Sequence, residues 1–374
     1  MSESLPGGVV RTDMAMNDGR TIRYYDKVDK VDKGSNARIA DDKRPVEAPA
    51  GIGELRLDPL VNEWIAVASH RQHRSFLPPK ELCPICPTTS DLLTEIPDSA
   101  FSVVVFDNKN PSLNAAPAGW VLPELNGPAT ATPAGVGKCE VVVFTDKHDS
   151  SLKELSEDQI ALVVAAWRDR TKEISKLPNI VQIFPFENRG VEVGVTIPHP
   201  HGQIYAYSYL TPRTERMLAV AQAHKTKTGR VLMDDIVSRE INDKVRIVAE
   251  NAHWVAYVPF ASRYPYEIHV APKKRVPDFA ELNDEQAAAL PSITKEGLSR
   301  LDGVYGIPMP YMASWHQAPV AMGRDLLGLH LQITSVRRTP DKLKYLAGSE
   351  SGVGAFVMDL APEQSAEQLK AVKL

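Results

Sequence analysis

The stretch His-Pro-His-Gly-Gln at residues 199–203 places two imidazoles and a carboxamide at alternate positions, His199, His201 and Gln203. Alternate side chains of a β-strand project from one face, so the pattern predicts that all three share a surface. A neutral imidazole, whose free pKa is about 6.5, is a nucleophile at pH 7. The stretch therefore indicates nucleophilic chemistry, although a lone histidine on a half-exposed strand is more often a hydrogen-bonded structural residue.

A polar, glycine-containing loop precedes these residues at 186–194. Asn188, Arg189, Gly190 and Gly194 offer backbone amides, a guanidinium and conformational freedom, which together suit the close approach of an anion. An Asn-X-Gly sequence on its own more often just forms a turn. Next to two histidines, the loop predicts a phosphate site.

The spacing of Cys83 and Cys86 allows two thiolates to bind one tetrahedral ion, but no second Cys-X-X-Cys pair exists. A metal site completed by histidines, a redox pair and coincidence all remain open. The third cysteine, Cys139, is expected to be buried in a strand. Arg71 and Arg74 precede the cysteine pair and indicate either a solvated basic loop or an anion site.

The chain has 374 residues, of which 43% are hydrophobic, so it can form two or three ordinary domains or one composite domain. No window approaches the run of about 20 apolar residues that crosses a membrane, and the first residues lack the pattern of a secretion signal. We therefore expect a cytoplasmic protein. A formal net charge of -4 without a long basic block argues against a general nucleic-acid-binding protein.

These candidate residues require elements to position them, and strand-like segments dominate after about residue 50. Residues 1–50 are polar and are expected to include a mobile leader. Two helices are predicted, one capped by Ser156 with Gln159 and one capped by Asn283 with Gln286. Pro291 is expected to kink or split the second helix.

The chain also contains an internal duplication. Glu140, Leu155 and Gln159 match Glu267, Leu282 and Gln286 at a constant offset of 127 residues. His330 and Gln332 then fall roughly where His201 and Gln203 stand, at an offset of 129 residues. The first copy has the richer chemistry.

Four motifs, Phe-Glu-Asn-Arg-Gly, His-Pro-His-Gly-Gln, Cys-Pro-Ile-Cys and Ser-Trp-His-Gln-Ala-Pro, together resemble the galactose-1-phosphate uridylyltransferase family, a branch of the histidine-triad superfamily. The resemblance extends from about residue 50 onward. It implies an α+β fold of two related histidine-triad-like halves, each a mostly antiparallel sheet flanked by helices. We place the catalytic half with its zinc site at 51–212 and the C-terminal half at 213–374, after the leader at 1–50.

The resemblance implies transfer of UMP from UDP-glucose to galactose 1-phosphate by double displacement, giving UDP-galactose and glucose 1-phosphate. His201 would be the nucleophile that forms a uridylyl-histidine, and Gln203 would hydrogen-bond a phosphate oxygen. A structural Zn²⁺ would be held by Cys83, Cys86, His148 and His199, and no organic cofactor is implied.

The resemblance also implies a homodimer, in which Arg71 and Arg74 reach into the active site of the other subunit. The residues expected around the uridine and its phosphates are Asn108, Asn188, Gly194, Thr196 and Gln203. Those expected around the sugar phosphate are Lys344, Gly348 and Glu350.

The sequence departs from the family at a second metal site, which some bacterial members build from a glutamate and three histidines. His316 and His330 are present here, but Gln332 and Met217 take the places of a histidine and the glutamate. This argues against a second metal and leaves His316 and His330 as its candidate ligands. Asn110 replaces an aromatic residue near the base, and Glu192 adds a negative charge to the phosphate loop.

Two alternatives to this function stay open. One is another nucleotidylyltransferase or phosphorylase of the same superfamily that acts on ADP-sugars. The other is a zinc-stabilised protein that binds a sugar nucleotide without turnover. The second alternative predicts ligand binding that survives the substitution His201→Ala and no covalent intermediate.

Overall fold

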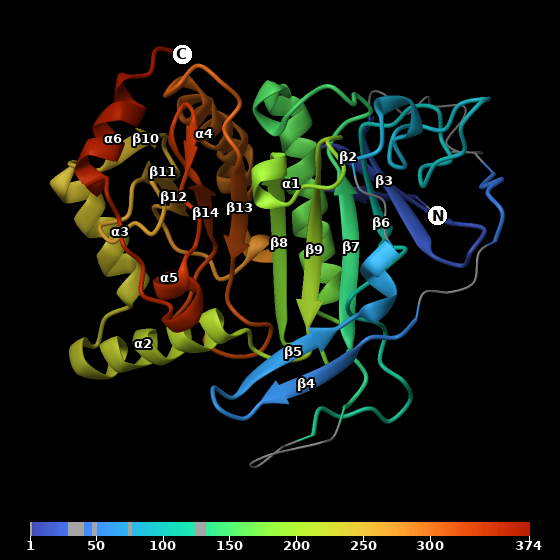
Figure 1. Cartoon of the computed structure of the whole chain (residues 1–374), viewed down its shortest axis with the longest axis horizontal. Coiled ribbons are helices and arrows are strands. Elements are labelled where there is room, and N and C mark those ends of the chain that lie inside the picture. The colour runs from blue at the N-terminus through green and yellow to red at the C-terminus, as the bar shows by residue number, and fades with distance from the viewer. Residues whose placement is uncertain (1, 29–40, 47–50, 74–76, 124–131) are drawn as a thin grey trace.

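The structure is a computed structural model that describes residues 2–28, 41–46, 51–73, 77–123 and 132–374. Its main feature is one antiparallel sheet of twelve strands within these residues (Figure 1). Across the sheet the strands are β1 (Ser2–Leu5), β2 (Val9–Ala15), β3 (Thr21–Lys27), β6 (Val103–Asp107), β7 (Gly137–Val143), β9 (His201–Tyr207), β8 (Gln182–Arg189), β13 (Tyr311–His316), β14 (His330–Ser335), β12 (Tyr266–Pro272), β11 (Trp254–Tyr257) and β10 (Ile247–Glu250).

Helices and two short hairpins complete the described part of the chain. The α-helices are α1 (Glu157–Ile174), α2 (Pro212–Thr228), α3 (Leu232–Asp243), α4 (Asp284–Gly303), α5 (Gly348–Val353) and α6 (Pro362–Ala371). The 3₁₀ helices are η2 (Ser69–His73), η3 (Lys80–Leu82), η4 (Leu152–Glu154), η5 (Val191–Val193) and η6 (Phe279–Glu281). The hairpins pair β4 (Glu54–Asp58) with β5 (Glu63–Val67), and β15 (Arg337–Thr339) with β16 (Lys342–Leu343).

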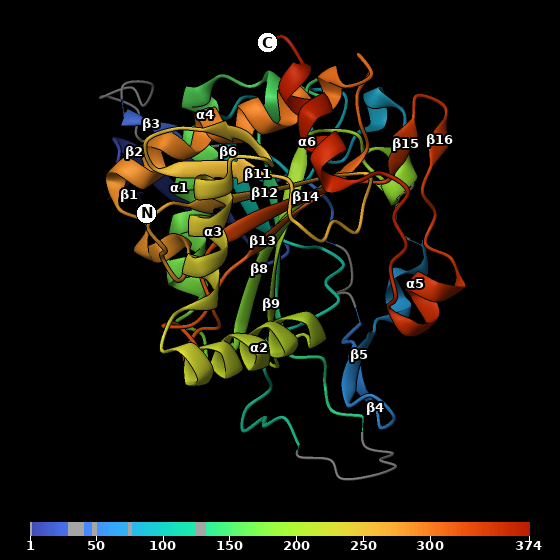
Figure 2. The same ribbon diagram turned by 90° about the vertical axis from the view of Figure 1, so that its left-hand side faces the viewer.

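The order of the strands repeats on the two sides of the β8–β13 pair. Reading outward from that pair, β8, β9, β7 and β6 match β13, β14, β12 and β11. Helices α1 and α4 pack on the same face of the sheet, one behind each set, and Figure 2 shows the β4–β5 hairpin and α5 away from them. The predicted fold class, two related halves with mostly antiparallel strands and flanking helices, is confirmed, while the division at residue 212 stays a prediction.

The two predicted helices begin where their capping residues stand. The side chain of Ser156 accepts a hydrogen bond from the backbone N–H of Gln159 at the start of α1, and Asn283 and Gln286 form a reciprocal capping box at α4. Pro291 lies inside α4, which continues to Gly303, so the proline does not split this helix, and the alternative, a kink, stays a prediction. The buried proline ring packs in the core, and this packing offsets the lost hydrogen bond.

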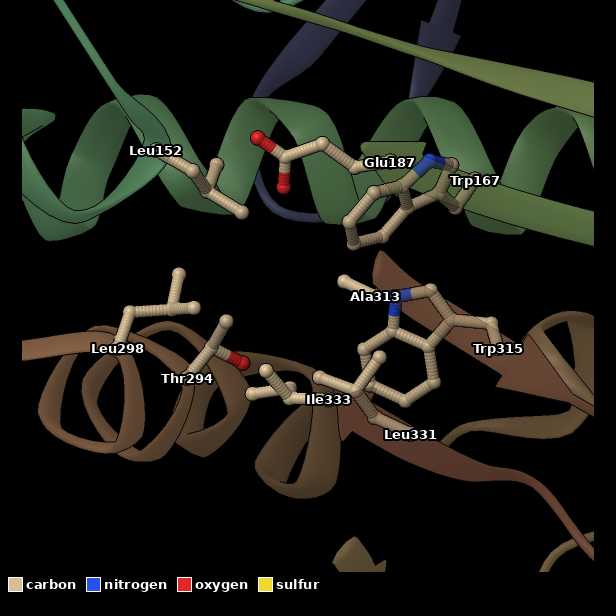
Figure 3. A pocket seen from close by; sticks show the side chains of 9 residues that line it. All are labelled: Leu152, Trp167, Glu187, Thr294, Leu298, Ala313, Trp315, Leu331 and Ile333. Carbon is tan, nitrogen blue, oxygen red and sulfur yellow. The ribbon is translucent and has the colours of Figure 1, made fainter. Parts of the chain in front are cut away.

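The core joins the two halves through aromatic packing. The ring of Phe279 lies 5.4 Å from that of Trp167 and 4.8 Å from that of Trp315, measured between centroids. Figure 3 shows the small cavity beside the rings of Trp167 and Trp315, between α1 and α4, with Glu187 in its lining. Because the sheet runs unbroken from β8 to β13 and the core spans the same junction, each half positions residues of the other.

The first 27 residues differ from the expected mobile leader, because three strands lie within them. β3 pairs with β6 and so extends the sheet of the first half. Ile22 and Tyr24 pack on one face beside Cys83, while the hydroxyl of Tyr25 on the other face donates a 2.6 Å hydrogen bond to Asp169. The high charge of the segment made its alternating apolar residues hard to recognise in the sequence. In the structure, arginines and aspartates of the segment pair with one another.

None of the helices in the described residues combines the length and apolar character needed to cross a lipid bilayer.

Candidate active site and metal-binding group

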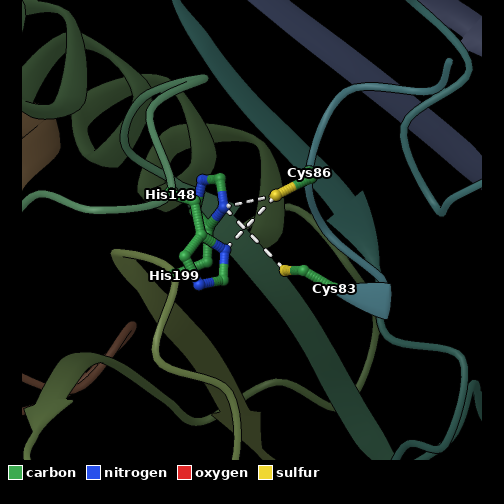
Figure 4. A group of neighbouring side chains, drawn as sticks. All are labelled: Cys83, Cys86, His148 and His199. Atoms are coloured by element: carbon green, nitrogen blue, oxygen red, sulfur yellow. Dashed lines mark hydrogen bonds between the residues drawn. The ribbon is translucent and has the colours of Figure 1, made fainter. Parts of the chain in front are cut away.

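Four side chains predicted to bind metal converge in the first half (Figure 4). The ligand atoms of Cys83, Cys86, His148 and His199 all lie within 4.8 Å of one another. The Sγ atom of Cys86 is 3.4 Å from Nδ1 of His148 and 3.3 Å from Nδ1 of His199. Two thiols and two imidazoles form the donor set of many structural zinc sites, so the residues fit a tetrahedral metal ion.

The electrostatic surroundings also suit a cation. Burial and the adjacent Cys83 raise the pKa of Cys86 to about 12, so its thiol holds a proton unless a positive charge compensates. Burial lowers the pKa of His199 to about 4, which keeps this imidazole neutral. A neutral imidazole is the form that binds metal.

His199 is held by the backbone on the far side of its ring. Its Nε2 atom lies 2.8 Å from the carbonyl oxygen of Thr145, and the side chain is almost fully buried. Because a carbonyl oxygen only accepts hydrogen bonds, Nε2 carries the proton and Nδ1 keeps its lone pair for a metal. The prediction that His199 shares a strand face with His201 is wrong, since β9 begins at His201 and Pro200 before it has no N–H to donate.

His201 is oriented by the backbone of His199. Its Nδ1 atom lies 2.8 Å from the carbonyl oxygen of His199, so Nδ1 is the protonated nitrogen and Nε2 retains a lone pair. Within the described residues, no hydrogen bond occupies this Nε2 atom. Burial lowers the pKa of His201, although the bond to His199 opposes the effect, so the ring is neutral at pH 7. The geometry presents an unprotonated nitrogen from a fixed ring.

A cavity of about 170 Å³ borders His201 and the polar loop. Its lining includes Asn188, Gly190, Ser150 and Ser151. The strand β9 comes close to its neighbours here because Gly202 has no side chain. A Cβ atom at Gly202 would lie 2.8 Å from both the Phe144 ring and the carbonyl oxygen of Phe186.

The loop differs from the expected anion cradle in two respects. The backbone amides of Val193 and Gly194 close the loop on itself by bonding to the carbonyls of Gly190 and Val191. The guanidinium of Arg189 turns away to the second half, where its Nη1 atom is 3.1 Å from Asp302. Polar side chains among the lining residues are therefore the clearer candidates to meet an anion, and Asn188, Ser150 and Ser151 supply them.

The charge of Glu192 is neutralised by a contact between the halves. Its carboxylate lies 2.6 Å from the guanidinium of Arg337. Gly190 has a φ of 100°, and a Cβ there would lie 2.8 Å from Glu192 and from Pro310. Only glycine fits this part of the loop without strain.

Of the predicted nucleotide residues, Gln203 projects from the same face of β9 as His201. Arg71 contacts its own chain, with Nη1 3.3 Å from the hydroxyl of Tyr205, and Arg74 lies outside the described residues. Asn108 follows β6, and its side-chain oxygen accepts a hydrogen bond from the backbone N–H of Asn110. Gly194 is the last residue of the loop, and Thr196 lies in the segment between the loop and β9.

The predicted sugar-phosphate residues gather in a different region. Lys344 donates to Glu350 at 3.0 Å and to the carbonyl oxygen of Val357 at 2.6 Å. Gly348 begins the short helix α5 that carries Glu350. Within the described part of the chain, none of these three lines the cavity beside His201.

The candidates for a second metal, His316 and His330, stack with ring centroids 5.2 Å apart. The amide of Gln332 lies 3.1 Å from Nε2 of His330, and its oxygen accepts a hydrogen bond from Arg213 at 3.0 Å. Met217 packs in an apolar cluster with Leu326. Among the described residues, the first-half group is the one that meets the geometry of a metal site.

Sequence reasoning missed several groups at the site. Ser150 and Ser151 border the cavity, and their position two and three residues after His148 was the available signal. The backbone carbonyl of Thr145 holds His199, which no side-chain pattern could reveal. Glu187 lies buried beneath the loop, where burial raises its pKa to about 7.

Family models match both halves of the chain. Residues 47–211 match the N-terminal domain of galactose-1-phosphate uridyl transferase, and residues 218–373 match its C-terminal domain. The chain is 39% identical over 380 residues to galactose-1-phosphate uridylyltransferase from Streptomyces lividans, covering 97% of this chain and 98% of that protein. It is 34% identical over 325 residues to the enzyme of the same name from Thermotoga maritima, covering 86% and 99%.

A comparison with solved structures gives the same family. A uridylyltransferase structure superposes with a TM-score of 0.75 and 33% sequence identity, covering 85% of this chain and 98% of that chain. The match of residues 47–211 to the N-terminal domain spans the loop, the cysteine pair and the strand that carries His201. The chain therefore belongs to the galactose-1-phosphate uridyl transferase family.

Proposed function

We propose that this protein transfers UMP from UDP-glucose to galactose 1-phosphate, as its relatives' names indicate. The observation that carries the proposal is the setting of His201. Its ring is fixed by the carbonyl of His199, its Nε2 atom is unprotonated, and it borders a cavity beside a polar loop. This arrangement suits a nucleophile that attacks phosphorus.

In the first step, Nε2 of His201 attacks the α-phosphorus of UDP-glucose. The bond from that phosphorus to the bridging oxygen breaks, and glucose 1-phosphate leaves with the bonding electrons. The histidine ring gains positive charge, and its Nδ1–H, bonded to the carbonyl oxygen of His199, stabilises that charge. No proton has to leave the ring, so a separate general base is unnecessary.

In the second step, a phosphate oxygen of galactose 1-phosphate attacks the same phosphorus. The bond between phosphorus and Nε2 breaks, which gives UDP-galactose and returns neutral His201. The two steps are mirror images, because both leaving groups are hexose 1-phosphates. One preorganised site therefore serves both directions.

The negative charge of the phosphates requires hydrogen-bond donors. Gln203 on the face of His201 and the side chains of Asn188, Ser150 and Ser151 are the nearest candidates. In our proposal Asn108, Gly194 and Thr196 complete the uridine and phosphate contacts. Lys344, Gly348 and Glu350 bind the sugar phosphate, and a homodimer brings Arg71 and Arg74 to the partner's site.

The metal in this proposal is Zn²⁺, held by Cys83, Cys86, His148 and His199. When bound, it supplies structural bracing rather than Lewis-acid chemistry, since all four ligands come from the protein. The chain's own contribution is His199, whose ring faces the metal group while its carbonyl holds His201. We also infer that the enzyme works in the cytoplasm.

The test is mass spectrometry of the intact protein after separate exposure to UDP-glucose and ADP-glucose. We expect one added uridylyl group per active site with UDP-glucose, release of glucose 1-phosphate, and no comparable adduct with ADP-glucose. His201→Ala should abolish the adduct. An adenylyl adduct of equal yield would contradict uridine specificity, and turnover without any adduct would contradict the double displacement.

A further inference from the structure

A second, larger pocket lies in the C-terminal half, beside α2, α3 and strand β14. Its volume is about 770 Å³, within the range typical of small-molecule sites. His330 and Gln332 border it, which are the counterparts of His201 and Gln203 in the internal repeat. We refer to this space as the second-half pocket.

The second-half pocket carries an excess of positive charge. Five arginines and two glutamates line it, a net charge of +3 with the histidines neutral; they are Arg213, Arg216, Arg239, Arg246, Arg263, Glu63 and Glu240. Arg246 is neutralised by Glu240 and Glu363, and Arg239 pairs with Asp243. Within the described residues, Arg213, Arg216 and Arg263 form no ion pair.

The positive charges of two of these arginines, Arg213 and Arg263, repel each other. Burial lowers the pKa of Arg213, and the positive charge of Arg263 lowers it further. Glu267 opposes the effect, but its carboxylate is engaged with His269 at 2.9 Å and with the backbone N–H of Arg263 at 2.6 Å. An anion between the two guanidiniums would relieve the repulsion.

The residues at this place do not fit a second metal ion. Arg213 brings a permanent positive charge within 3.0 Å of the Gln332 oxygen, and the Gln332 amide occupies Nε2 of His330. Met217 supplies no carboxylate. A cation would have to displace both hydrogen bonds and lie beside a guanidinium, which Coulomb repulsion opposes.

The rest of the lining suits a flat organic group. Phe260 is 69% exposed and lines the pocket, and the guanidinium of Arg246 lies 5.1 Å from its ring centroid. Phe356 lies under the Arg263 guanidinium at 5.9 Å. Rings next to guanidiniums can stack on a base while the guanidiniums bind its phosphate.

We propose that the second-half pocket binds a nucleotide, with Arg213 and Arg263 on the phosphate and Phe260 and Phe356 against the base. The site is separate from the cavity beside His201. Gln332 occupies the second nitrogen of His330, and Glu267 holds Nε2 of His269, the other histidine that lines the pocket. Its role is binding without chemistry. The proposal does not depend on the reaction assigned to His201.

The experiment is calorimetric titration of the full-length protein with UMP, AMP and inorganic pyrophosphate, for the wild type, Arg213→Ala, Arg263→Ala and Arg230→Ala. Arg230 is an exposed arginine that follows α2 and does not line the pocket, so it controls for loss of charge. The contact of Arg263 with Glu267 uses the backbone, so Arg263→Ala preserves it. Bound metal is counted in each sample.

We expect one nucleotide equivalent whose affinity falls at least about tenfold in both pocket variants and is unchanged in Arg230→Ala. The yield of the His201 adduct should stay constant in all four proteins, which separates this test from that of the proposed function. The proposal is overturned if no equivalent responds to the two substitutions or if pyrophosphate binds as tightly as the nucleotides. A second metal equivalent lost in His330→Gln would also overturn it.

Discussion

The two halves orient equivalent histidines, His201 and His330, through the same backbone contact, but the surroundings of the second ring nitrogen differ. His201 bonds through Nδ1 to the carbonyl two residues earlier at 2.8 Å, and His330 does so at 2.9 Å. In the first half His201 lines a cavity and no hydrogen bond among the described residues engages its other nitrogen, whereas in the second half Gln332 engages that nitrogen of His330. The repeated strand therefore sets the orientation of the ring. Its reactivity depends on whether a neighbouring side chain hydrogen-bonds the second nitrogen.

The residues two positions before each histidine extend this comparison. In the first half that residue is His199, whose side chain belongs to the metal-binding group. In the second half it is Gly328, which offers only its carbonyl. The repeat therefore needs the backbone contact in both copies, and the metal group is an addition specific to the copy with the open imidazole.

The largest expected effect comes from exchanging the imidazoles for carboxamides. His201→Gln should lower the rate of exchange between UDP-glucose and glucose 1-phosphate by at least about 10⁴-fold, because the nucleophile is lost. His330→Gln should stay within about tenfold of the wild type, since its ring is already occupied. Equal losses in the two variants, measured by isotope exchange, would break the comparison.

The second effect concerns the metal group. Cys83→Ala should abolish the zinc binding that we propose for this group and lower activity by about 10–100-fold or more, because the support of His199 weakens. Cys139→Ala changes a buried cysteine of β7 outside the group and provides the matched control. Metal content by elemental analysis and activity are measured together, and loss of zinc with full activity would contradict the bracing role.

The third effect concerns a matched pair of buried glutamates. Glu140 accepts hydrogen bonds from Arg170 at 2.8 and 2.9 Å, while its counterpart Glu267 bonds to His269. Glu140→Gln removes the carboxylate that accepts both hydrogen bonds and leaves buried Arg170 with only the more distant Asp169, 3.9 Å away, so it should lower the free energy of unfolding by about 3–5 kcal/mol. Glu267→Gln should lower it by about 1–3 kcal/mol.

The pH dependence provides a check on Glu140. Burial raises its pKa, but the charge of Arg170 outweighs burial, so the net shift is downward. The stabilisation is then present above the pKa of the unfolded state, about 4.3, and is lost as the pH falls below it. In urea unfolding experiments the gap between wild type and Glu140→Gln should shrink in acid, and a constant gap would refute the ionised pair.

The smallest effect comes from Glu187, whose neighbour across the β8–β13 pair is Ala313. No other residue in the cavity lining of Figure 3 titrates. Burial raises its pKa to about 7, so its stabilisation is complete below its ordinary pKa and is lost as the pH rises towards 7. The loss is at most about 3 kcal/mol. Glu187→Gln should flatten the unfolding free energy over this range, whereas the exposed control Glu285→Gln should leave the slope unchanged.

Local sequence patterns predicted much of the site. The Cys83–Cys86 spacing and the caps at Ser156 and Asn283 depend on residues a few positions apart, so they could be recognised directly. His148 could be assigned only through family resemblance, because it meets Cys86 across 62 residues. Contacts over such separations depend on strand order, which no local pattern contains.

Other features lay beyond sequence reasoning for the same physical reason. The strands within residues 2–27 looked like a solvated segment because of their charges, some of which pair between neighbouring strands, as Arg11 does with Glu3 and Arg23 with Asp107. Arg189 looked available to a phosphate, but Asp302 in the other half holds it. The second-half pocket involves Arg213 and Arg263, which are polar residues with no motif around them.

His199 has one further consequence, because its ring and its carbonyl serve different neighbours. Any displacement of the ring by an ill-fitting ion, or by oxidation of the two thiols, must turn the peptide group that aims the nucleophile. Oxidation of the two cysteines would therefore inactivate the enzyme under conditions in which the protein stays folded. Under oxidative or metal stress the protein would lose its uridylyl-transfer activity, while its β-sheet stayed folded.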